Sequence, residues 1–399
     1  MAIVMYYFVI WYILAVFCYI STIPHKKQIS RILFITAYLA IALTSGLRYE
    51  TGTDYFAYSG IYSDIYPLNI AIEQGKLFPI QTLIEPSYLF ICSLFAMFEA
   101  SINIMFLAIS LTTTALLFNS TKKYIPKYFY FGVLLYYSYI FFLLDMSGVR
   151  QAIALNLFIF SIRYILNKNI LKFFLIISIA ISFHYTAAML LFFYPLCNMK
   201  FSRVTMISIM AISFTILVLK LPWIGTVFDL LGSALNNELL SSKLLTYASS
   251  NFLTKNRSLS PVMLMYVPVF IVAVLYREKL SKTTPYYNIL LNMFMFFMVS
   301  VFALYESEDI SVRISSYFMF GFCMILPLTL ELIKIGASRI IMVTSILILS
   351  LYSIRNMIYS DQISTILFRP YQNYILIETS IQHSDARKRN NTFLYHLGD

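Results

Sequence analysis

The fold of this chain is decided by two apolar stretches joined by a short turn. The first is Tyr128–Leu144, YFYFGVLLYYSYIFFLL, the turn is Asp145–Gly148, DMSG, and the second is Val149–Leu166, VRQAIALNLFIFSIRYIL. Each stretch has about the length at which an α-helix crosses the hydrocarbon core of a bilayer. Because the connection is so short, the second helix must run back beside the first. The pair therefore predicts two membrane-spanning helices joined by a tight turn.

Comparable apolar runs occur along the whole chain. They are Ile3–Ile20, Ile32–Leu47, Ile102–Phe118, Ile170–Leu196, Val204–Leu221, Pro261–Tyr276, Tyr286–Leu304, Ile314–Ile333 and Ile340–Tyr352. Of the 399 residues, 60% are hydrophobic and 12% are charged, which is about half the charged share of a soluble protein. In lipid only helices and closed barrels satisfy the backbone, and these runs lack the alternation of barrel strands. The sequence predicts an all-α polytopic membrane protein with about 11 to 14 transmembrane or re-entrant helices.

Several chemistries lack their sequence signatures. The cysteines lie inside or at the ends of apolar runs and the histidines are scattered, so we expect packing residues and no metal site. These residues are Cys18, Cys92, Cys197, Cys323, His25, His184, His383 and His396. No glycine-rich phosphate loop or nucleophile elbow occurs in the sequence, so we expect no cofactor. The net charge of +11 fits basic cytoplasmic loops beside anionic lipid better than nucleic acid.

The basic residues set the expected orientation, because cytoplasmic loops carry an excess of Lys and Arg. Short basic loops contain Lys26, Lys27, Arg31, Lys122, Lys123, Lys127, Lys168, Lys172, Lys200, Arg203, Arg277, Lys279, Lys282, Lys334 and Arg339. With these inside, the N-terminus, which shows no cleavable signal peptide, and the segment from Arg355 face outward. We expect one transmembrane helical domain over residues 1–371, with outer loops at about 48–83 and 222–260, and a C-terminal tail over 372–399 that carries Arg387–Arg389.

Two apolar segments do not fit a simple count of spans. Leu83–Phe98 begins with Glu85-Pro86, and proline fits the first turn of a helix. As a full span it would place the following lysine-rich loop outside, so it is either a re-entrant or interfacial helix or a local exception to the charge rule. Ile170–Leu196 is either one long tilted helix or two pieces broken near His184. His184 itself is either a hydrogen-bonded core residue or a group that transfers a proton or binds a ligand.

Arginines stand at the predicted outer ends of several helices. They are Arg48, Arg150, Arg313 and Arg369. A guanidinium stays charged and offers a fork to phosphate oxygens, so these residues are candidates for binding an anionic lipid phosphate. Arg150 lies at a helix N-terminus, where free N–H groups also favour anions. Two plainer interpretations stay open: Arg48 as an anchor that snorkels to the interface, and Arg150 as the ion-pair partner of Asp145.

The first outer loop predicts a short helix with tyrosines on one face. Thr53 or Asp54 can cap this helix, and Tyr55, Tyr58 and Tyr62 then share a side by their spacing. A tyrosine face offers flat apolar rings and hydroxyl groups, which suits sugar rings. The alternative is an aromatic belt at the membrane interface.

These pieces, taken in order, resemble the EpsG family, the Wzy-like polymerases of bacterial surface polysaccharides. The matching pieces are Arg48…Gly52-Thr53-Asp54-Tyr55…Tyr58, Glu85-Pro86-Ser87-Tyr88, Arg150-Gln151-Ala152-Ile153-Ala154, Phe183-His184-Tyr185-Thr186-Ala187, Arg313 with Tyr317, and Pro370-Tyr371. The resemblance covers about Ile32 to Tyr371.

The resemblance implies a membrane glycosyltransferase of GT-C-like architecture. Such an enzyme joins oligosaccharide repeat units carried on undecaprenyl pyrophosphate, on the outer face of the bacterial cytoplasmic (inner) membrane. The implied partners are the lipid-linked oligosaccharide, a flippase that delivers it, a co-polymerase that sets chain length, and the bilayer. No nucleic acid is expected to bind.

The same resemblance gives each candidate residue an expected role. Arg48, Arg150 and Arg313 would stabilise the charge that grows on the leaving diphosphate. His184 would take the proton of the acceptor hydroxyl or position the acceptor, with Asp54 or Glu85 as alternative bases. The expected substrate-binding residues are Asp54, Tyr55, Tyr58, Glu85, Gln151, Tyr317, Arg369 and Tyr371.

Other functions compete with a polymerase. An O-antigen ligase would use the same lipid donor with a different acceptor. A polysaccharide flippase would be a transporter without catalysis and would more often show two related halves, for which the sequence has no repeat. An acyltransferase that modifies sugars should carry more histidines at the inner face.

Overall fold

The computed structural model describes residues 6–22, 27–75, 84–234, 261–359 and 362–376. The expectations for His25, Lys26, residues 235–260 of the second outer loop and residues 377–399 of the tail lie outside these ranges.

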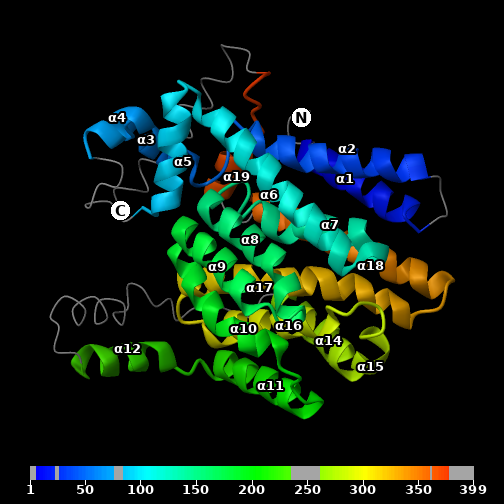
Figure 1. The fold of residues 1–399 in the computed structure, drawn as a ribbon. Coiled ribbons are helices and arrows are strands. Elements are labelled where there is room, and N and C mark those ends of the chain that lie inside the picture. Colours follow the sequence, from blue (N-terminus) through cyan, green and yellow to red (C-terminus); the bar gives the residue numbers. More distant parts are fainter. Residues whose placement is uncertain (1–5, 23–26, 76–83, 235–260, 360–361, 377–399) are drawn as a thin grey trace. The chain divides into compact units, whose positions relative to one another are not determined.

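The described helices fall into two compact units. The first unit covers 1–192 and 333–399 and contains α1 (Tyr6–Ile20), α2 (Lys27–Gly46), α3 (Tyr55–Asp64), α4 (Leu68–Glu73), α5 (Pro86–Met97), α6 (Ile102–Tyr124), η2 (Pro126–Tyr128), α7 (Phe129–Tyr136), the π-helical η3 (Tyr137–Phe141), α8 (Val149–Leu166), α9 (Ile170–Phe183), η4 (Tyr185–Met189), α18 (Ala337–Tyr359) and α19 (Gln362–Phe368) (Figure 1). The second unit covers 193–332 and contains α11 (Arg203–Leu219), α12 (Trp223–Ala234), α14 (Pro261–Leu275), α15 (Arg277–Leu280), α16 (Tyr287–Ala303), α17 (Glu308–Leu328) and η5 (Thr329–Leu332). The unit boundary falls inside α10 (Leu190–Asn198). No strand occurs within the described ranges, where the β-pairing is an isolated bridge between Arg48 and Asn373.

The helices have the length and surface of a membrane protein. In the part of the chain that the structure describes, five are long and apolar enough to cross a bilayer, and six shorter helices are also apolar. The exposed side of α9 carries Leu171, Leu175 and Ile179, which are 78%, 62% and 44% exposed. Such a stripe would be costly in water and is expected against lipid. The prediction of an all-α polytopic membrane protein is confirmed.

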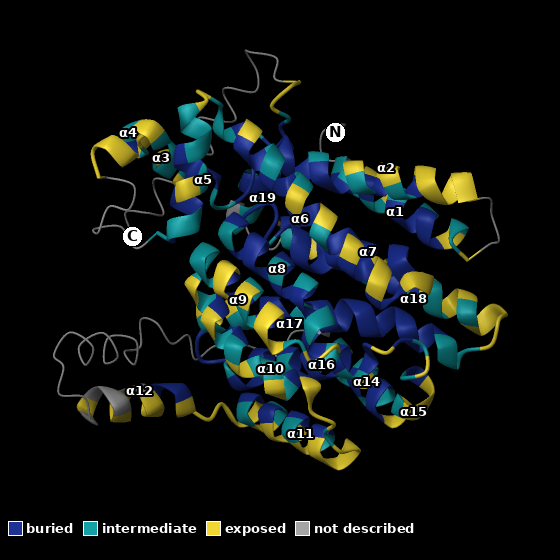
Figure 2. Ribbon diagram, viewed as in Figure 1, coloured by how far each residue is buried: buried dark blue, intermediate teal, exposed yellow. Residues whose placement is uncertain are grey.

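Three helices of the first unit form the frame of the site. The C-terminal end of α2 packs on the N-terminal end of α6, where Ser45 Oγ and Ser110 Oγ lie 2.5 Å apart. Gly46 permits this approach, because an added Cβ would meet the Leu107 backbone at 2.9 Å. α6 also packs on α8, where Tyr124 Oη, from the last residue of α6, donates to Ile159 O in the C-terminal half of α8. Figure 2 shows that α2 buries one side in this packing and exposes the other.

The observed helices differ from the expected runs in three places. The stretch Tyr128–Leu144 is not one regular helix: α7 passes into the π-helical η3 and then into a turn over 142–147. The last span is longer than Ile340–Tyr352, because Ile354 and Ile358 keep one side of α18 buried and carry the helix past Arg355. The segment after Glu85 forms only the 12-residue α5. Its length of about 18 Å is well short of a bilayer core, which favours the interfacial or re-entrant alternative.

The apolar run from Ile170 is broken at His184, as one of the two alternatives predicted. α9 ends at Phe183, and His184 has extended backbone angles, with φ −158° and ψ 112°. The chain then resumes as the short η4 and as α10. The break turns the His184 side chain out of the helix line and toward Glu85.

In the second unit, α16 and α17 form the central pair. Ser307 begins α17 by accepting a hydrogen bond from the Ile310 backbone N–H, and acidic residues in the first turn complement the helix dipole. The Glu306 carboxylate, which is fully buried, accepts the backbone N–H groups of Ile224 at 2.8 Å and Gly225 at 3.2 Å.

Candidate functional site

Glu85 is the centre of the candidate site. It stands in extended conformation directly before α5, and Pro86 occupies the first helical position, where its missing N–H costs nothing. The Glu85 backbone O accepts from Tyr88 N and Leu89 N, which fixes the residue at the helix start. Its side chain is only 5% exposed. A carboxylate this deeply buried requires partners.

The two partners of Glu85 come from distant helices. Arg150 Nη1, in the first turn of α8, lies 2.5 Å from Glu85 Oε2. His184 Nδ1, at the break after α9, lies 2.9 Å from Glu85 Oε1, which the Tyr185 backbone N–H also approaches at 3.3 Å. The structure therefore brings together three predicted site residues that lie 65 and 99 positions apart in the sequence.

The charge state of Glu85 follows from these contacts. Burial raises the pKa of the carboxyl, but the hydrogen bond from His184 and the charge of Arg150 outweigh it and lower the pKa from 4.5 to about 2. Glu85 is thus an anion at neutral pH. With Nδ1 of His184 directed at this anion, the other ring nitrogen, Nε2, is left to act on another group.

His184 and Arg150 each have a side-chain nitrogen that lacks a hydrogen-bond partner among the described residues. His184 Nε2 and Arg150 Nε are buried and have no hydrogen-bond partner among the described residues. The Arg150 side chain as a whole remains 26% exposed, although its Nε is buried. Buried polar atoms without partners are uncommon and call for a ligand, a water or a movement that satisfies them.

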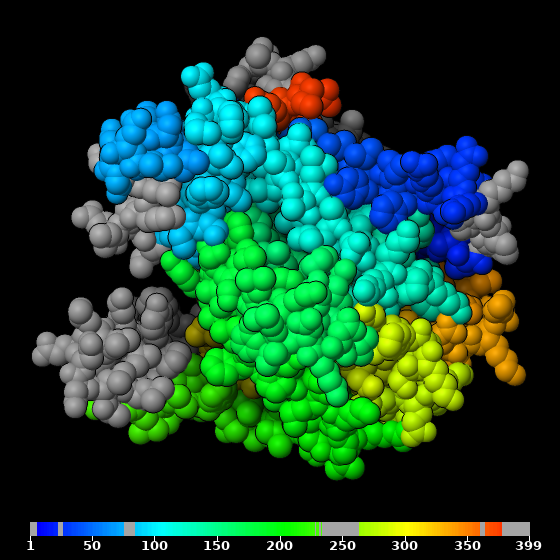
Figure 3. All heavy atoms as spheres, viewed as in Figure 1, coloured from blue at the N-terminus to red at the C-terminus, as the bar shows by residue number. Residues whose placement is uncertain are grey.

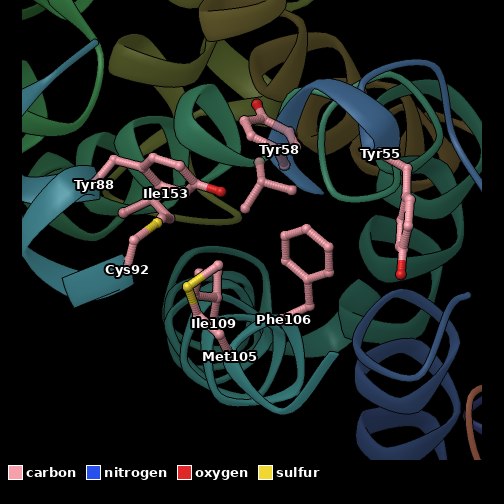
Figure 4. Packing of buried hydrophobic residues seen from close by; sticks show 9 residues of the cluster. Tyr55, Tyr58, Tyr88, Cys92, Met105, Phe106, Ile109 and Ile153 are labelled. Atoms are coloured by element: carbon pink, nitrogen blue, oxygen red, sulfur yellow. The ribbon is translucent and has the colours of Figure 1, made fainter. Parts of the chain in front are cut away.

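Aromatic rings surround the Arg150 guanidinium. Its central carbon lies 5.6 Å from the Tyr58 ring centre and 6.0 Å from that of Tyr88, within cation–π range. Tyr58 and Tyr88 are almost fully buried, in a cluster that also includes Phe106 of α6. Figure 4 shows the Phe106 ring between those of Tyr58 and Tyr55. Tyr58 and Tyr88 therefore hold the position of Arg150.

The predicted tyrosine face of α3 points inward. Asp54 occupies the N-cap position but makes no capping bond with its side chain, which instead accepts from Thr53 Oγ1 at 2.9 Å. Tyr55 and Tyr58 are 3% and 2% exposed, and Tyr55 Oη donates to Asn103 Oδ1 at 2.9 Å. Tyr55 and Tyr58 thus form part of the core beneath the site. Their expected contacts with sugar, and the substrate-binding role of Asp54, stay predictions.

Arg48 is not a snorkelling anchor, because it is only 1% exposed. Its Nη1 donates to Ser45 O at 2.6 Å and Asp145 O at 3.3 Å, and its guanidinium carbon lies 4.2 Å from the Phe106 ring centre. Nε and Nη2 have no partner among the described residues. A cavity of about 10 Å³ adjoins Arg48 and Asp145, close to the volume that one water needs.

The turn before α8 does not pair Asp145 with Arg150. Asp145 Oδ2 accepts from Tyr136 Oη at 2.8 Å, and Asn156 Nδ2 in turn donates to Tyr136 Oη at 3.1 Å. Burial raises the pKa of Asp145 to about 7, against the opposing effects of Tyr136 and Arg48. Arg150 therefore forms its ion pair with Glu85 and not with Asp145.

The C-terminal segment after α19 packs on the loop that carries Arg48. Tyr49 N donates to Gln372 O and Tyr374 N donates to Leu47 O, on either side of the bridge between Arg48 and Asn373. This packing continues into the segment expected to be the tail. Tyr371 is 8% exposed and packs in this region, and its expected role in binding substrate stays a prediction.

Arg369 and Gln151, two further predicted substrate-binding residues, also lie in the first unit. The Arg369 guanidinium carbon lies 4.6 Å from the Tyr359 ring centre. Gln151 follows Arg150 in α8 and is 8% exposed. Their roles toward substrate stay predictions.

Arg313 and Tyr317 lie in α17 of the second unit, with Arg313 exposed and Tyr317 buried. Their expected convergence with Arg48 and Arg150 stays a prediction.

Sequence reasoning missed Tyr88, Asn103 and Tyr136 as neighbours of the site. Tyr88 belongs to the matching segment Glu85-Pro86-Ser87-Tyr88 and lies in the first turn of α5, three residues after Glu85. This spacing could have identified it as a neighbour of Glu85. Asn103 and Tyr136 are single polar groups in apolar runs, and only the packing of α6, α3 and α7 gives them partners. Within the described ranges, no three His, Cys, Asp or Glu side chains gather as metal ligands.

Comparison with known proteins identifies the class. The family model of the EpsG family matches residues 31–373, so the chain belongs to the EpsG family. It is a multi-pass membrane protein of a family consistent with polysaccharide polymerisation. No curated protein and no solved structure matches the chain.

Proposed function

We propose that this protein is a glycosyltransferase that polymerises oligosaccharide units carried on undecaprenyl pyrophosphate at the outer face of the bacterial inner membrane. The observation that carries the proposal is the contact of one buried carboxylate, Glu85, with both Arg150 and His184. This arrangement offers an oriented base and a fixed cation side by side, without any nucleotide-binding loop.

His184 is the proposed base. The acceptor hydroxyl bonds to the anomeric carbon of the donor, the bond from that carbon to the diphosphate oxygen breaks, and the electron pair leaves with the polyprenyl diphosphate. The acceptor proton moves to Nε2 of His184. The Glu85 carboxylate at Nδ1 stabilises the resulting imidazolium and fixes the ring tautomer, as the acid does in a catalytic triad. Because Nε2 is shielded, the acceptor must displace a neighbouring side chain to reach it.

Arg150 is the proposed electrophilic group. Before reaction the positive charge of Arg150 is balanced by the Glu85 carboxylate. Proton transfer to His184 adds one positive charge to the group of Arg150, Glu85 and His184 while negative charge develops on the leaving diphosphate. The site thus gains positive charge in step with the transition state rather than with the bound substrate.

The test replaces Arg150 by alanine and measures polymer length on gels of cell-surface glycan. Arg355→Ala is the matched control, because Arg355 is an exposed arginine of α18 in the same unit. At equal membrane levels, R150A should lose long polymer by a factor of about 100 or more, whereas R355A should keep it. Full-length polymer from R150A would remove Arg150 from the mechanism.

Two further readouts separate the competing functions. Loss of a polymerase leaves single repeat units attached to the acceptor lipid core, whereas loss of a ligase leaves none attached. Purified protein in detergent should lengthen lipid-linked repeats, since there is no second membrane side for a transporter to serve. Absence of elongation by folded, monodisperse preparations would favour the flippase.

A further inference from the structure

A second concentration of charge lies at the opposite ends of the helices that frame the site. Arg150 opens α8, whereas Arg163 lies 13 residues later, about 20 Å along the same helix. α2 begins at Lys27, and its opposite end leads into Arg48. α6 carries Lys122 in its last turn. The mechanism uses none of the residues at these far ends.

Two adjoining hollows occupy this end, with volumes of about 610 and 800 Å³. They share Phe34 and Lys122, and we call them together the basic groove. Its lining residues include Lys27, Arg31, Phe34, Lys122, Lys127 and Arg163. Every acidic or basic side chain among the described lining residues is a lysine or an arginine.

The groove follows from helix spacing. Lys27, Arg31 and Phe34 recur at intervals of four and three residues, so they lie on one side of α2. Asn119 and Lys122 lie on the facing side of α6, which packs beside α2. In the space-filling view the blue atoms of α2 adjoin the cyan atoms of α6 on the visible face (Figure 3).

Two cations of the basic groove, Arg163 and Lys122, have contacts that fix their positions. Arg163 Nη2 donates to Asn119 Oδ1 at 2.7 Å and Arg163 Nε donates to Phe160 O at 3.0 Å. The Lys122 ammonium lies 4.9 Å from the Phe34 ring centre. A fixed guanidinium beside an ammonium on an aromatic floor suits a phosphate with an attached apolar body.

The outer side of α2 supplies the apolar part. Ile32, Ile35 and Leu39 are 56%, 45% and 41% exposed, and by their spacing they form a stripe that runs from the groove along the helix. Acyl chains can lie along this stripe while the headgroup occupies the basic groove. Basic pockets between membrane helices bind anionic headgroups in this manner.

We propose that the basic groove binds the headgroup phosphate of an anionic phospholipid, in the leaflet opposite to the Glu85 site. This site is distinct from the one that would hold the polyprenyl diphosphate, and it does not depend on the proposed reaction. Its occupant stabilises the packing of α2, α6 and α8 at their basic ends.

The experiment measures thermal unfolding of the purified full-length protein in detergent during titration with phosphatidylglycerol. Phosphatidylcholine and glycerol phosphate are the comparison ligands. Phosphatidylglycerol alone should raise the melting temperature. The variant Arg31→Gln/Lys122→Gln should need on the order of 10-fold more of it for the same rise.

Three variants complete the design. Lys172→Gln/Lys334→Gln removes two exposed lysines of the same unit outside the groove and should titrate as the wild type does. R150A should also titrate normally, because the second site does not involve Arg150. If the double groove variant is not monodisperse, Arg31→Gln alone gives the same comparison.

The proposal is overturned if the groove variant titrates as the wild type does, or if the Lys172/Lys334 control weakens equally, since the effect would then be general electrostatic attraction. An equal rise with glycerol phosphate would also overturn it, because the occupant would then be a soluble phosphate and not a lipid.

Discussion

Glu85 contacts both Arg150 and His184 through one carboxylate that is only 5% exposed. A buried ion pair gains little overall, because desolvation offsets attraction, but removal of one partner leaves the other charge uncompensated. Removal of either member of such a pair would therefore disturb the member that remains. Glu85 serves to position Arg150 and His184 relative to each other, and its loss should affect both.

Glu85→Gln tests this at the level of stability. The folded pKa of Glu85 lies below its ordinary value, so the ionised carboxylate stabilises the protein above pH 4.5, and this contribution is lost as the pH falls toward 2. We expect E85Q to be less stable than the wild type by about 3 kcal/mol at pH 7, with the difference shrinking below pH 4.5. Thermal unfolding in detergent from pH 7 to 3 measures this. Glu73→Gln, at an exposed carboxylate of α4, should follow the wild type throughout, and a pH-independent deficit of E85Q would contradict the assignment.

Asp145 has the opposite sign of pH dependence. Burial raises its folded pKa from 3.8 to about 7, so the folded state holds the proton more tightly and stability falls as the pH rises through this range. Asp145→Asn keeps an acceptor for Tyr136 Oη but cannot ionise. We expect D145N to exceed the wild type in melting temperature at pH 8 and to lose most of that advantage at pH 5. An advantage of equal size at both values would contradict a titration of Asp145.

At the scale of elements, apolar runs and breaking residues were sufficient to predict most helices. Pro86 marked the start of α5, and the polar His184 within an apolar run marked a break. The contacts of Glu85 were not predictable in the same way, because they join α5, α8 and α9, and sequence spacing carries no information on which helix ends meet. The irregular η3 had no signal either, since its aromatic run also suits a regular helix.

Gly52 fixes the loop of Arg48 against the turn before α8. Its φ is +105°, which a residue with a side chain rarely adopts, and an added Cβ would overlap the backbone oxygen of Met146. Gly52→Ala should destabilise the protein by about 2 kcal/mol or more and reduce polymer length. Gly60→Ala is the control, because Gly60 lies in α3 with no atom within 4 Å of an added Cβ and alanine favours helix. Equal melting temperatures of the two variants would show that Gly52 does not hold the loop.

At the scale of the whole first unit, the same three helices connect two regions of different chemistry. α2 has 20 residues and thus a length of about 30 Å, which equals the thickness of a bilayer core. The loop after α2 belongs to the Glu85 end, and the first turn of α2 belongs to the basic groove. If α2 crosses the membrane, these two ends must lie on opposite faces.

Cysteine labelling tests that orientation. The four native cysteines are buried and unpaired, so they can be replaced by alanine or serine to give a background without reactive thiols. Asp64→Cys places a thiol at the exposed end of α3 near the candidate site, and Lys123→Cys places one at the exposed end of α6 beside the basic groove. A membrane-impermeant maleimide should label D64C in intact spheroplasts and K123C only after the membrane is opened, because the excess of Lys and Arg predicts that the basic end faces the cytoplasm. The reverse pattern would put the Glu85 site on the cytoplasmic face, where an acceptor already moved across the membrane could not reach His184, and the proposed reaction would fail with it.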